Sequence, residues 1–117
     1  MIRLIKSFGY AIHGIMTFLR RERNGQLQAF AAVCTVALGF YLHISNMEWI
    51  LIIACIGAVI SLEMINSSIE RICNISFEGY HREVKLIKDM AAGAVLIAAI
   101  ASLIIALIIF VPKIMSS

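Results

Sequence analysis

Charged residues are scarce in this 117-residue chain. Asp, Glu, Lys and Arg together make up 15% of it, whereas 62% is hydrophobic. A soluble domain of this length buries only about two-thirds of the surface of its unfolded chain, so it could not hide this much apolar area. The composition therefore excludes an ordinary soluble domain and indicates an integral membrane protein.

Cysteine pairs and nucleotide-binding loops are also missing. The three cysteines stand singly in apolar segments without a CxxC pair, so we expect neither a disulfide framework nor a zinc site. The chain contains neither GxxxxGKS/T nor GxGxxG. A bound nucleotide would therefore have its phosphates held by side chains instead of a glycine-rich loop. No long apolar stretch precedes Arg20, and we expect no cleaved signal peptide.

The N-terminal segment has apolar residues on one side of a helix. Ile2, Ile5, Phe8 and Ile12 follow helical spacing, and basic residues fall largely off this stripe. A basic helix with one apolar face is typical of a helix that lies on a membrane surface, and we expect it over residues 2–20. The polar run RRERNGQ follows, with Asn24-Gly25 as a turn signal.

The rest of the chain is divided into long apolar segments. Each is long enough to cross a hydrocarbon layer of ~30 Å as a helix. A polar connector over 76–88 separates the last two, and Pro112 discourages helix beyond the third. The sequence thus predicts an all-α integral membrane protein formed by one domain over 1–117. It consists of the amphipathic surface helix and three transmembrane helices at 27–44, 48–75 and 89–111.

Basic residues are concentrated on one side of these segments. Lys and Arg precede the first crossing and lie between the second and third, but none lies between the first two. By the positive-inside rule the N-terminus and the 76–88 connector of this multi-pass membrane protein are cytoplasmic. Small residues at four-residue spacing (Ala94, Ala98, Ser102 and Ala106) let helices approach closely, and we expect an oligomer.

The stretch LEMINSSIERICN, residues 62–74, brings polar groups into the second apolar segment. Asn66, Ser67, Glu70 and Asn74 all fall within roughly 60° of Glu63 on a helical wheel. Glu63 lies on the order of 20 Å from Trp49, towards the cytoplasmic end of the membrane. A carboxylate at the centre of a membrane helix costs about 3 kcal/mol, so such a residue is by default a functional-site hypothesis. The alternative is an ion pair that only fixes helix packing.

Further charges gather at the same membrane side. Glu22 precedes the first crossing, and Lys88 and Asp89 precede the third, with Arg3 and Lys6 on the surface helix. Carboxylate oxygens suit Mg²⁺, which proteins commonly hold through one or two carboxylates together with substrate phosphates, and the cations suit the phosphates. The polar stripe therefore predicts a nucleotide-phosphate site that reaches into the lipid.

Two other classes of function compete with this interpretation. A small proton or cation conduit could use Glu63 and Glu70, but it needs a polar path through the full membrane depth. The outer halves of the crossings offer little beyond Thr35 and Ser102. A purely structural membrane subunit leaves the polar stripe unexplained.

The blocks LEMINSSIE and KDMAAGAVLIA closely resemble the small prokaryotic diacylglycerol kinase and undecaprenol kinase family. The IRLIKSFGYAIHG start, the ERN step and the MEW start of the second crossing follow the family's order and spacing. The resemblance covers nearly the whole chain. It implies a homotrimer of three-crossing subunits with active sites shared between neighbours, which transfers the ATP γ-phosphoryl group to a membrane lipid hydroxyl with Mg²⁺.

The resemblance also implies roles for individual residues. Glu63 matches the catalytic base for the lipid hydroxyl, and Asn66 matches an Asn that orients the base or the phosphate. Glu22 and Glu70 match the carboxylates that hold the metal with ATP. The positions around the nucleotide are Arg3, Lys6, Tyr10, Glu22, Glu70, Lys88 and Asp89.

Three positions depart from the family pattern. Asn74 stands where the motif usually ends in aspartate, and Gln26 and Gln28 follow the ERN step. The MEW start and the KDMAAGAVL block look closer to the undecaprenol branch than to the diacylglycerol branch. No residue distinguishes the two lipids reliably, so both remain candidate substrates at this point.

Overall fold

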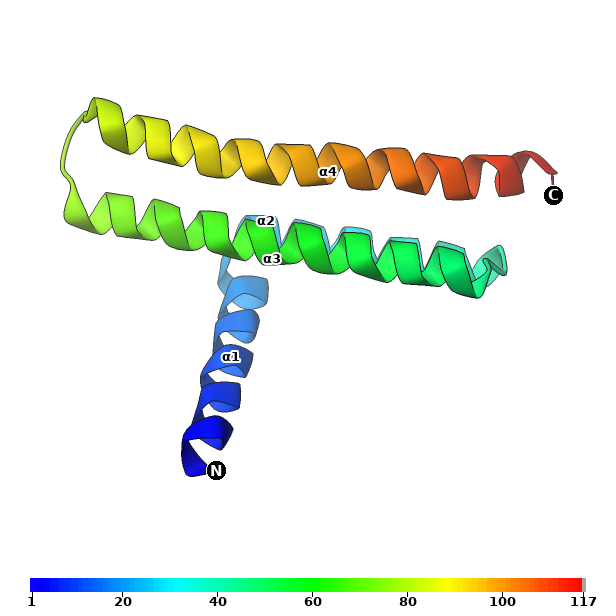
Figure 1. The fold of residues 1–117 in the computed structure, drawn as a ribbon, viewed down its shortest axis with the longest axis horizontal. Helices are drawn as coiled ribbons and strands as arrows, with labels where there is room; N and C mark the ends of the chain where they lie inside the picture. The colour runs from blue at the N-terminus through cyan, green and yellow to red at the C-terminus, as the bar shows by residue number, and fades with distance from the viewer. Residues whose placement is uncertain (117) are drawn as a thin grey trace.

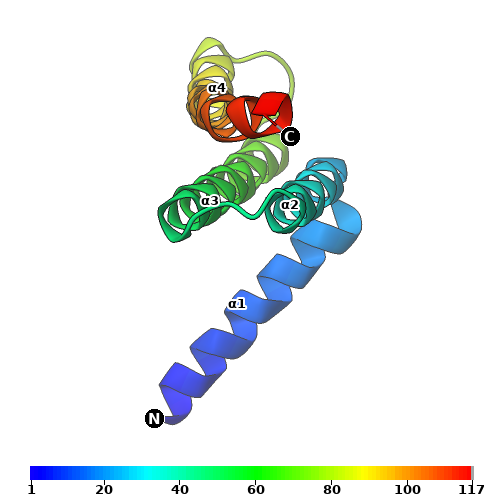
Figure 2. The same cartoon turned by 90° about the vertical axis from the view of Figure 1, so that its right-hand side faces the viewer.

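A computed structural model describes residues 1–116, and within them all regular structure is α-helical (Figure 1). Three helices, α2 (Arg23–Tyr41), α3 (Asn46–Ser76) and α4 (Arg82–Ser116), lie side by side, and α1 (Ile2–Arg21) projects away from them. Viewed along the bundle, α3 occupies the middle and packs against both α2 and α4 (Figure 2). The expected all-α class is thereby confirmed.

The helix α1 is attached to the bundle only near its C-terminal end. Phe18 is buried, with 5% of its surface exposed, whereas Ile2, Ile5 and Phe8 are exposed. This leaves an apolar face on α1 that water would not cover favourably. Such a helix, set across a bundle of long apolar helices, has the orientation expected for a helix lying on the membrane surface.

The corner between α1 and α2 is sharper than the sequence predicts. Only Glu22 leaves the helical conformation, with φ −94° and ψ 127°, and Asn24-Gly25, expected to form a turn, lies inside α2. Gly25 has a different role, because a Cβ there would lie 2.3 Å from the carbonyl oxygen of Phe18. The glycine thus allows close approach of α1 to α2. Gln26 secures the corner by donating to the carbonyl oxygen of Arg20 at 2.8 Å.

The turn between α2 and α3 is built from two capping motifs. His43 has the left-handed conformation, with φ 54°. Its N–H donates to the carbonyl oxygen of Phe40, and the N–H of Ile44 donates to the carbonyl oxygen of Gly39, which together form a Schellman motif. At the start of α3, the Ser45 hydroxyl accepts from the Glu48 N–H while the Glu48 carboxylate accepts from the Ser45 N–H. Helix α2 therefore ends at Tyr41, earlier than the expected 44.

The tightest packing lies at this end of the bundle. Ile44, Ile52, Ile109 and Phe110 form its buried core. The rings of Phe40 and Trp49 pack beside it with centroids 4.8 Å apart. An ion pair between Lys113 Nζ and Glu48 Oε1, at 3.2 Å, links the C-terminal end of α4 to the first turn of α3. The bundle is thus closed at the end away from Glu63.

Two boundaries of the third apolar segment differ from the expectation. The connector is short, because α3 continues to Ser76 and α4 begins at Arg82, so only 77–81 separates them instead of 76–88. Pro112 lies inside α4, which continues to Ser116. One proline removes a single backbone hydrogen bond. Burial of the neighbouring Ile109 and Phe110 against the core holds the last turns in place.

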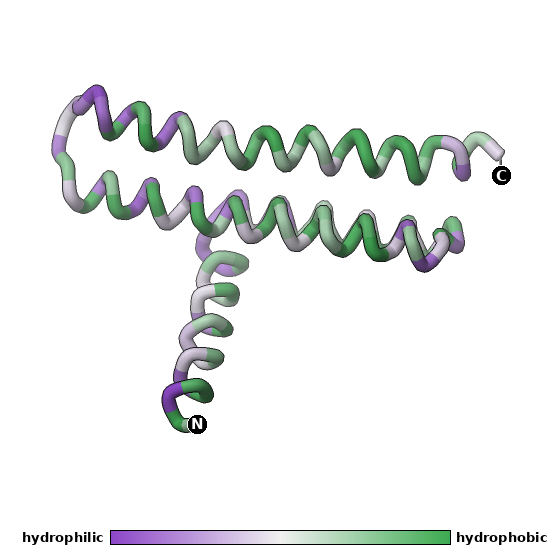
Figure 3. The backbone as a smooth tube through the Cα atoms, in the orientation of Figure 1, coloured by the Kyte–Doolittle hydropathy of each residue, from purple (hydrophilic) through white to green (hydrophobic). Residues whose placement is uncertain are grey.

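Two helices, α3 and α4, are long and apolar enough to cross a membrane. Helix α2, expected as the first crossing, does not reach the same hydropathy because its first turns carry Arg23, Asn24, Gln26 and Gln28. Figure 3 shows the apolar stretches along α2, α3 and α4, and polar residues at the α3–α4 connector and at the α1–α2 corner. Both polar regions lie on the same side of the bundle.

Candidate active site

The polar stripe of α3 lies where α2 and α1 meet the bundle. Glu63 and Asn66 are its buried members, with 8% and 6% of their surface exposed. Burial of a carboxylate requires a hydrogen-bonding partner, because an ionised group loses its hydration there. The structure supplies that partner from α2.

Glu63 is held by an amide and not by a cation. Gln28 Nε2 on α2 donates to Glu63 Oε1 at 3.4 Å. Within residues 1–116, none of the ion pairs involves Glu63. The interpretation of Glu63 as one half of a packing ion pair is therefore wrong for the single chain. A carboxylate without a cationic partner remains free to accept a proton.

Asn66 lies one turn further along α3 and contacts Glu70, the second acidic residue of the stripe. Its Nδ2 donates to Glu70 Oε1 at 3.3 Å. This bond fixes the direction of the amide, so the carbonyl oxygen Oδ1 points the other way. That oxygen is buried and has no hydrogen-bond partner within residues 1–116. An unpaired buried acceptor is costly, and a bound hydroxyl donor would satisfy it.

Glu22, at the corner between α1 and α2, contacts α3 through an arginine. Arg71 Nη2 and Nε both donate to Glu22 Oε1, at 2.5 and 3.2 Å. A pocket of ≈ 330 Å³ surrounds this pair. Hydroxyl, imidazole and guanidinium groups line it, together with glycine and apolar side chains: His13, Gly14, Thr17, Phe18, Glu22, Met64, Ser67, Ser68 and Arg71.

Arg71 and His13 are members of this corner that the sequence does not single out. Arg71 lies 49 residues from Glu22, and on the wheel it falls outside the Glu63 stripe. One feature of the sequence could have predicted the Glu22–Arg71 ion pair. Glu22 precedes one long helix and Arg71 lies late in the next, so the two side chains meet if these helices run antiparallel.

The two predicted residues on α4 have different partners. Lys88 Nζ donates to Asn74 Oδ1 at 2.8 Å, which ties the start of α4 to the end of α3. Asp89 pairs with Lys85 Nζ at 2.7 Å, one turn away on the same exposed face. Lys88 is thereby placed beside the polar stripe, and Asn74, although neutral, already provides the oxygen that holds it.

Replacing Asn74 tests whether the neutral side chain weakens this contact. We expect Asn74→Asp to change kcat by less than about twofold, because an exposed pair gains little from a full charge. We expect Asn74→Leu to release Lys88 and to raise the KM for a phosphate-bearing substrate, which the polar stripe is predicted to bind. The measurement is steady-state kinetics of both variants. A several-fold rise in kcat for Asn74→Asp would contradict this and identify Asn74 as a damaging substitution.

Three predicted residues remain apart from the stripe in the single chain. Arg3, Lys6 and Tyr10 are exposed on the part of α1 that points away from the bundle (Figure 1). The physical reason is the corner at Glu22, which sends α1 outwards instead of back along α3.

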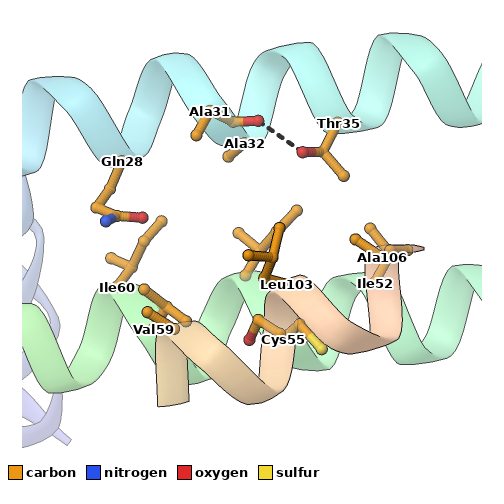
Figure 4. A pocket seen from close by; sticks show the side chains of 13 residues that line it. Gln28, Ala31, Ala32, Thr35, Ile52, Cys55, Val59, Ile60, Leu103 and Ala106 are labelled. Atoms are coloured by element: carbon orange, nitrogen blue, oxygen red, sulfur yellow. Dashed lines mark hydrogen bonds between the residues drawn. The ribbon is translucent and has the colours of Figure 1, made fainter. Parts of the chain in front are cut away.

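A long groove adjoins the site on the membrane side. It lies between α2 and α4, over α3, with a volume of ≈ 240 Å³ (Figure 4). Gln28, the partner of Glu63, forms one end of its lining, and Ile52 and Ala106 form the other. The groove therefore extends from Gln28, the hydrogen-bond partner of Glu63, along the apolar part of the three-helix bundle.

Comparison with known proteins agrees with the geometry. Residues 9–110 match the family model for prokaryotic diacylglycerol kinase. The chain is 42% identical to the undecaprenol kinase of Bacillus subtilis (strain 168), over 95% of this chain and 90% of that protein. It is 31% identical to a diacylglycerol kinase of Synechocystis, over 97% and 65%. It is 29% identical to the diacylglycerol kinase of Escherichia coli (strain K12), over 87% and 84%.

Proposed function

Because the chain belongs to the prokaryotic diacylglycerol kinase family and is a membrane lipid kinase, we propose that it transfers the γ-phosphoryl group of MgATP to a lipid hydroxyl at the cytoplasmic membrane surface. The observation that carries the proposal is Glu63, a buried carboxylate without a cationic partner, next to the unpaired carbonyl oxygen of Asn66. The conduit and the structural subunit, the two alternatives, have no support among the relatives.

Undecaprenol is the acceptor that we propose. The relative named undecaprenol kinase is 42% identical to this chain over 95% of this chain's length, against 29–31% for the diacylglycerol kinases of Escherichia coli and Synechocystis. This agrees with the MEW start of α3 and the KDMAAGAVL block, which look closer to the undecaprenol branch.

The reaction that we propose is a direct transfer. The lipid hydroxyl oxygen attacks the γ-phosphorus, the bond to the β-phosphate oxygen breaks, and Glu63 accepts the hydroxyl proton. Asn66, whose amide is oriented by Glu70, accepts from that hydroxyl through Oδ1 and aligns it with the base. Such a transfer depends mainly on positioning and on charge neutralisation. Lys88, beside the stripe, and Arg71 supply cations from within the chain.

The carboxylates of Glu22 and Glu70 are the type of ligand that Mg²⁺ prefers. Glu22 and Glu70 offer hard oxygen ligands, and Mg²⁺ is commonly held by one or two carboxylates together with substrate phosphates. Within residues 1–116 no group of three or more His, Cys, Asp or Glu side chains is gathered, so substrate phosphate oxygens and water would supply the other ligands. Bound there, the ion would neutralise phosphate charge. Arg71 would have to share Glu22 with it.

A homotrimer with shared sites accounts for the residues that the single chain leaves apart. Arg3, Lys6 and Tyr10 are exposed on the outward part of α1, where they could reach the stripe of a neighbour. Large apolar side chains remain exposed along all three bundle helices, so faces are available both for lipid and for other copies.

The proposed orientation places three helices across the inner membrane, with the N-terminus and the 76–88 region cytoplasmic. It is supported by the basic residues near Glu22 and at the α3–α4 connector, whereas Lys113 at the other end is paired with Glu48. Helix α1 branches from the bundle at Glu22 (Figure 1), and its last turns line one pocket with Met64, the residue after Glu63. If α1 lies on the surface, the base is therefore at the membrane boundary, where a lipid hydroxyl meets phosphates from the cytoplasm.

The test of the proposed function is ATP-dependent phosphorylation by the purified protein in detergent micelles. Undecaprenol and diacylglycerol are offered separately with Mg²⁺. We expect transfer to undecaprenol with the higher kcat/KM, and a rate about 10²–10⁴-fold lower in Glu63→Gln. Preference for diacylglycerol would overturn the assigned acceptor, and no transfer to either lipid by a folded protein would overturn the kinase reaction.

The proposed metal ligand Glu70 gives a separate prediction. We expect Glu70→Gln to raise the Mg²⁺ concentration for half-maximal rate several-fold, because an amide oxygen is a weaker ligand than a carboxylate. The measurement is initial rate against Mg²⁺ at saturating ATP. Glu78→Gln, an exposed carboxylate in the 77–81 connector, is the matched control and leaves the titration unchanged. An identical titration for both variants would remove Glu70 from the ligand set.

A further inference from the structure

We infer that Arg71 makes the pocket at the corner between α1 and α2 selective for a divalent cation that carries phosphate over the free cation. Its guanidinium, which contacts Glu22, opposes a bare cation at that carboxylate and binds the phosphate of a nucleotide that arrives with its metal. The inference rests on the proposed function, because it takes Glu22 as a metal ligand and MgATP as the substrate. It adds the residue that decides which form of the metal is accepted.

The contact between Arg71 and Glu22 uses only one oxygen of the carboxylate. Nη2 and Nε of Arg71 both donate to Oε1, at 2.5 and 3.2 Å. The other oxygen, Oε2, takes part in none of the hydrogen bonds and ion pairs of residues 1–116. A guanidinium forms its strongest contact when two parallel N–H groups bind both oxygens of a carboxylate. The pair observed here lacks that geometry and leaves half of the carboxylate to another ligand.

The ion pair is also open to water, which allows it to be exchanged. The side chain of Arg71 is 60% exposed and that of Glu22 is 28% exposed. An exposed ion pair contributes little to stability, so little is lost if the guanidinium leaves Glu22 for phosphate. Arg71 directly follows Glu70, the other proposed metal ligand, in α3. A guanidinium that leaves Glu22 therefore stays close to the phosphates that accompany the metal.

The charge of Arg71 gives the pocket its selectivity. A guanidinium is always protonated in proteins, so a free divalent cation that approaches Glu22 meets a fixed positive charge bound to the same carboxylate. The complex of Mg²⁺ with ATP has a net negative charge, and the same guanidinium attracts it. Arginine also suits phosphate in shape, because its planar N–H groups match two phosphate oxygens. Arg71 thus disfavours the free ion and favours its nucleotide complex.

The ligands around the pocket favour the same form of the metal. Glu22 is the one carboxylate among the described residues that line it, and residues 1–116 contain no group of three or more His, Cys, Asp or Glu side chains. Mg²⁺ loses its water reluctantly and is usually held by one or two carboxylates together with substrate phosphates. A free ion would therefore gain little here, whereas an ion that brings phosphate oxygens needs few ligands from the protein.

The pocket has room and further donors for a phosphate group. Its volume is ≈ 330 Å³, and Thr17 on α1 and Ser67 on α3 line it together with Arg71. The Ser68 hydroxyl already donates to the Met64 carbonyl oxygen at 2.9 Å. Those of Thr17 and Ser67 take part in none of the hydrogen bonds of residues 1–116. Two hydroxyl donors and one guanidinium therefore face a space that a phosphate could enter.

The test measures binding of the free cation and of its nucleotide complex, without turnover. Mn²⁺, detected by electron paramagnetic resonance, is titrated into the purified protein in detergent, and a non-hydrolysable ATP analogue with Mg²⁺ is titrated by calorimetry. We expect Arg71→Gln to bind free Mn²⁺ about two- to fivefold more tightly, because an exposed competing ion pair is removed. It should bind the analogue with Mg²⁺ about tenfold more weakly, as loss of a hydrogen bond to a charged group predicts.

Three further variants identify the cause of these changes. Arg71→Lys keeps the charge, so its Mn²⁺ affinity should equal that of the wild type, while its affinity for the analogue should lie between those of the wild type and Arg71→Gln. In the Glu22→Gln, Arg71→Gln double variant the gain in Mn²⁺ affinity should disappear. Arg82→Gln removes the same charge from an exposed position at the start of α4, outside the pocket, and should change neither affinity.

Opposite changes in the two affinities separate this role from a structural one. If Arg71→Gln binds both ligands more weakly, or binds both as the wild type does, Arg71 only supports the corner and the inference is wrong. A gain in Mn²⁺ affinity that persists in the double variant would also overturn it, because the competition would not be at Glu22. Failure of the proposed function would be seen elsewhere, in a wild type that neither binds the analogue nor phosphorylates a lipid.

Discussion

Glu63→Gln should reduce lipid phosphorylation by about 10²–10⁴-fold, the contribution typical of a general base. The amide cannot accept the hydroxyl proton, although it has the size of the carboxylate and can still contact Gln28. Because the neutral side chain is less costly to bury, the variant should fold at least as well as the wild type. The measurements are initial rates with undecaprenol, ATP binding, and thermal unfolding in detergent.

The matched control for this variant lies on the same helix. Glu48→Gln removes a carboxylate from the closed end of the bundle, where it pairs with Lys113 and caps α3. We expect its rate to stay within about twofold of wild type, with at most a small loss of stability, because an exposed ion pair contributes little. A rate for Glu63→Gln within tenfold of wild type, or loss of ATP binding together with activity, would contradict the assignment of Glu63 as the base.

Gly25→Ala should have the second largest effect on activity, and it should also lower stability, whereas replacing glycine by alanine inside a helix usually raises it. Alanine inside a helix is usually favoured over glycine by about 1 kcal/mol. At Gly25 the added Cβ would lie 2.3 Å from the carbonyl oxygen of Phe18, so the backbone must move. We expect destabilisation of about 1–3 kcal/mol, as in other overpacked sites. The rate should also fall by more than tenfold, since the shift displaces Glu22.

Gly57→Ala provides the comparison for Gly25→Ala. A Cβ at Gly57 meets no atom within 4 Å in the single chain. We expect this variant to be as stable as the wild type or slightly more so, and fully active. Thermal unfolding and the rate of lipid phosphorylation are measured on both. If Gly25→Ala equals Gly57→Ala in both measurements, the close approach of α1 and α2 is not needed for the site.

The local pattern of the chain was sufficient for most of the fold. Apolar runs and one amphipathic stripe predicted four helices, and the wheel around Glu63 predicted the polar face of α3. The errors lie where packing overrides local preference. Asn24-Gly25 is helical because glycine is needed for contact with Phe18, and α4 passes through Pro112 because Ile109 and Phe110 hold its end.

The candidate site was only partly accessible from the sequence. Residues that share one helix, such as Glu63, Asn66 and Glu70, could be grouped by spacing alone. Partners on other helices could not, because a sequence gives no register between helices. Gln28 beside Glu63, Arg71 beside Glu22 and Asn74 beside Lys88 each depend on how α2, α3 and α4 align.

The sequence by itself determined that this protein is a helical membrane protein with a buried carboxylate stripe, because composition and periodicity are local properties. The tertiary structure alone decided that Glu63 has an amide instead of a cation as its partner, and that α1 leaves the bundle at Glu22. It also decided that a groove leads from Gln28 to a closed core. These features arise from the packing of three helices against one another, which fixes distances between residues far apart in the chain.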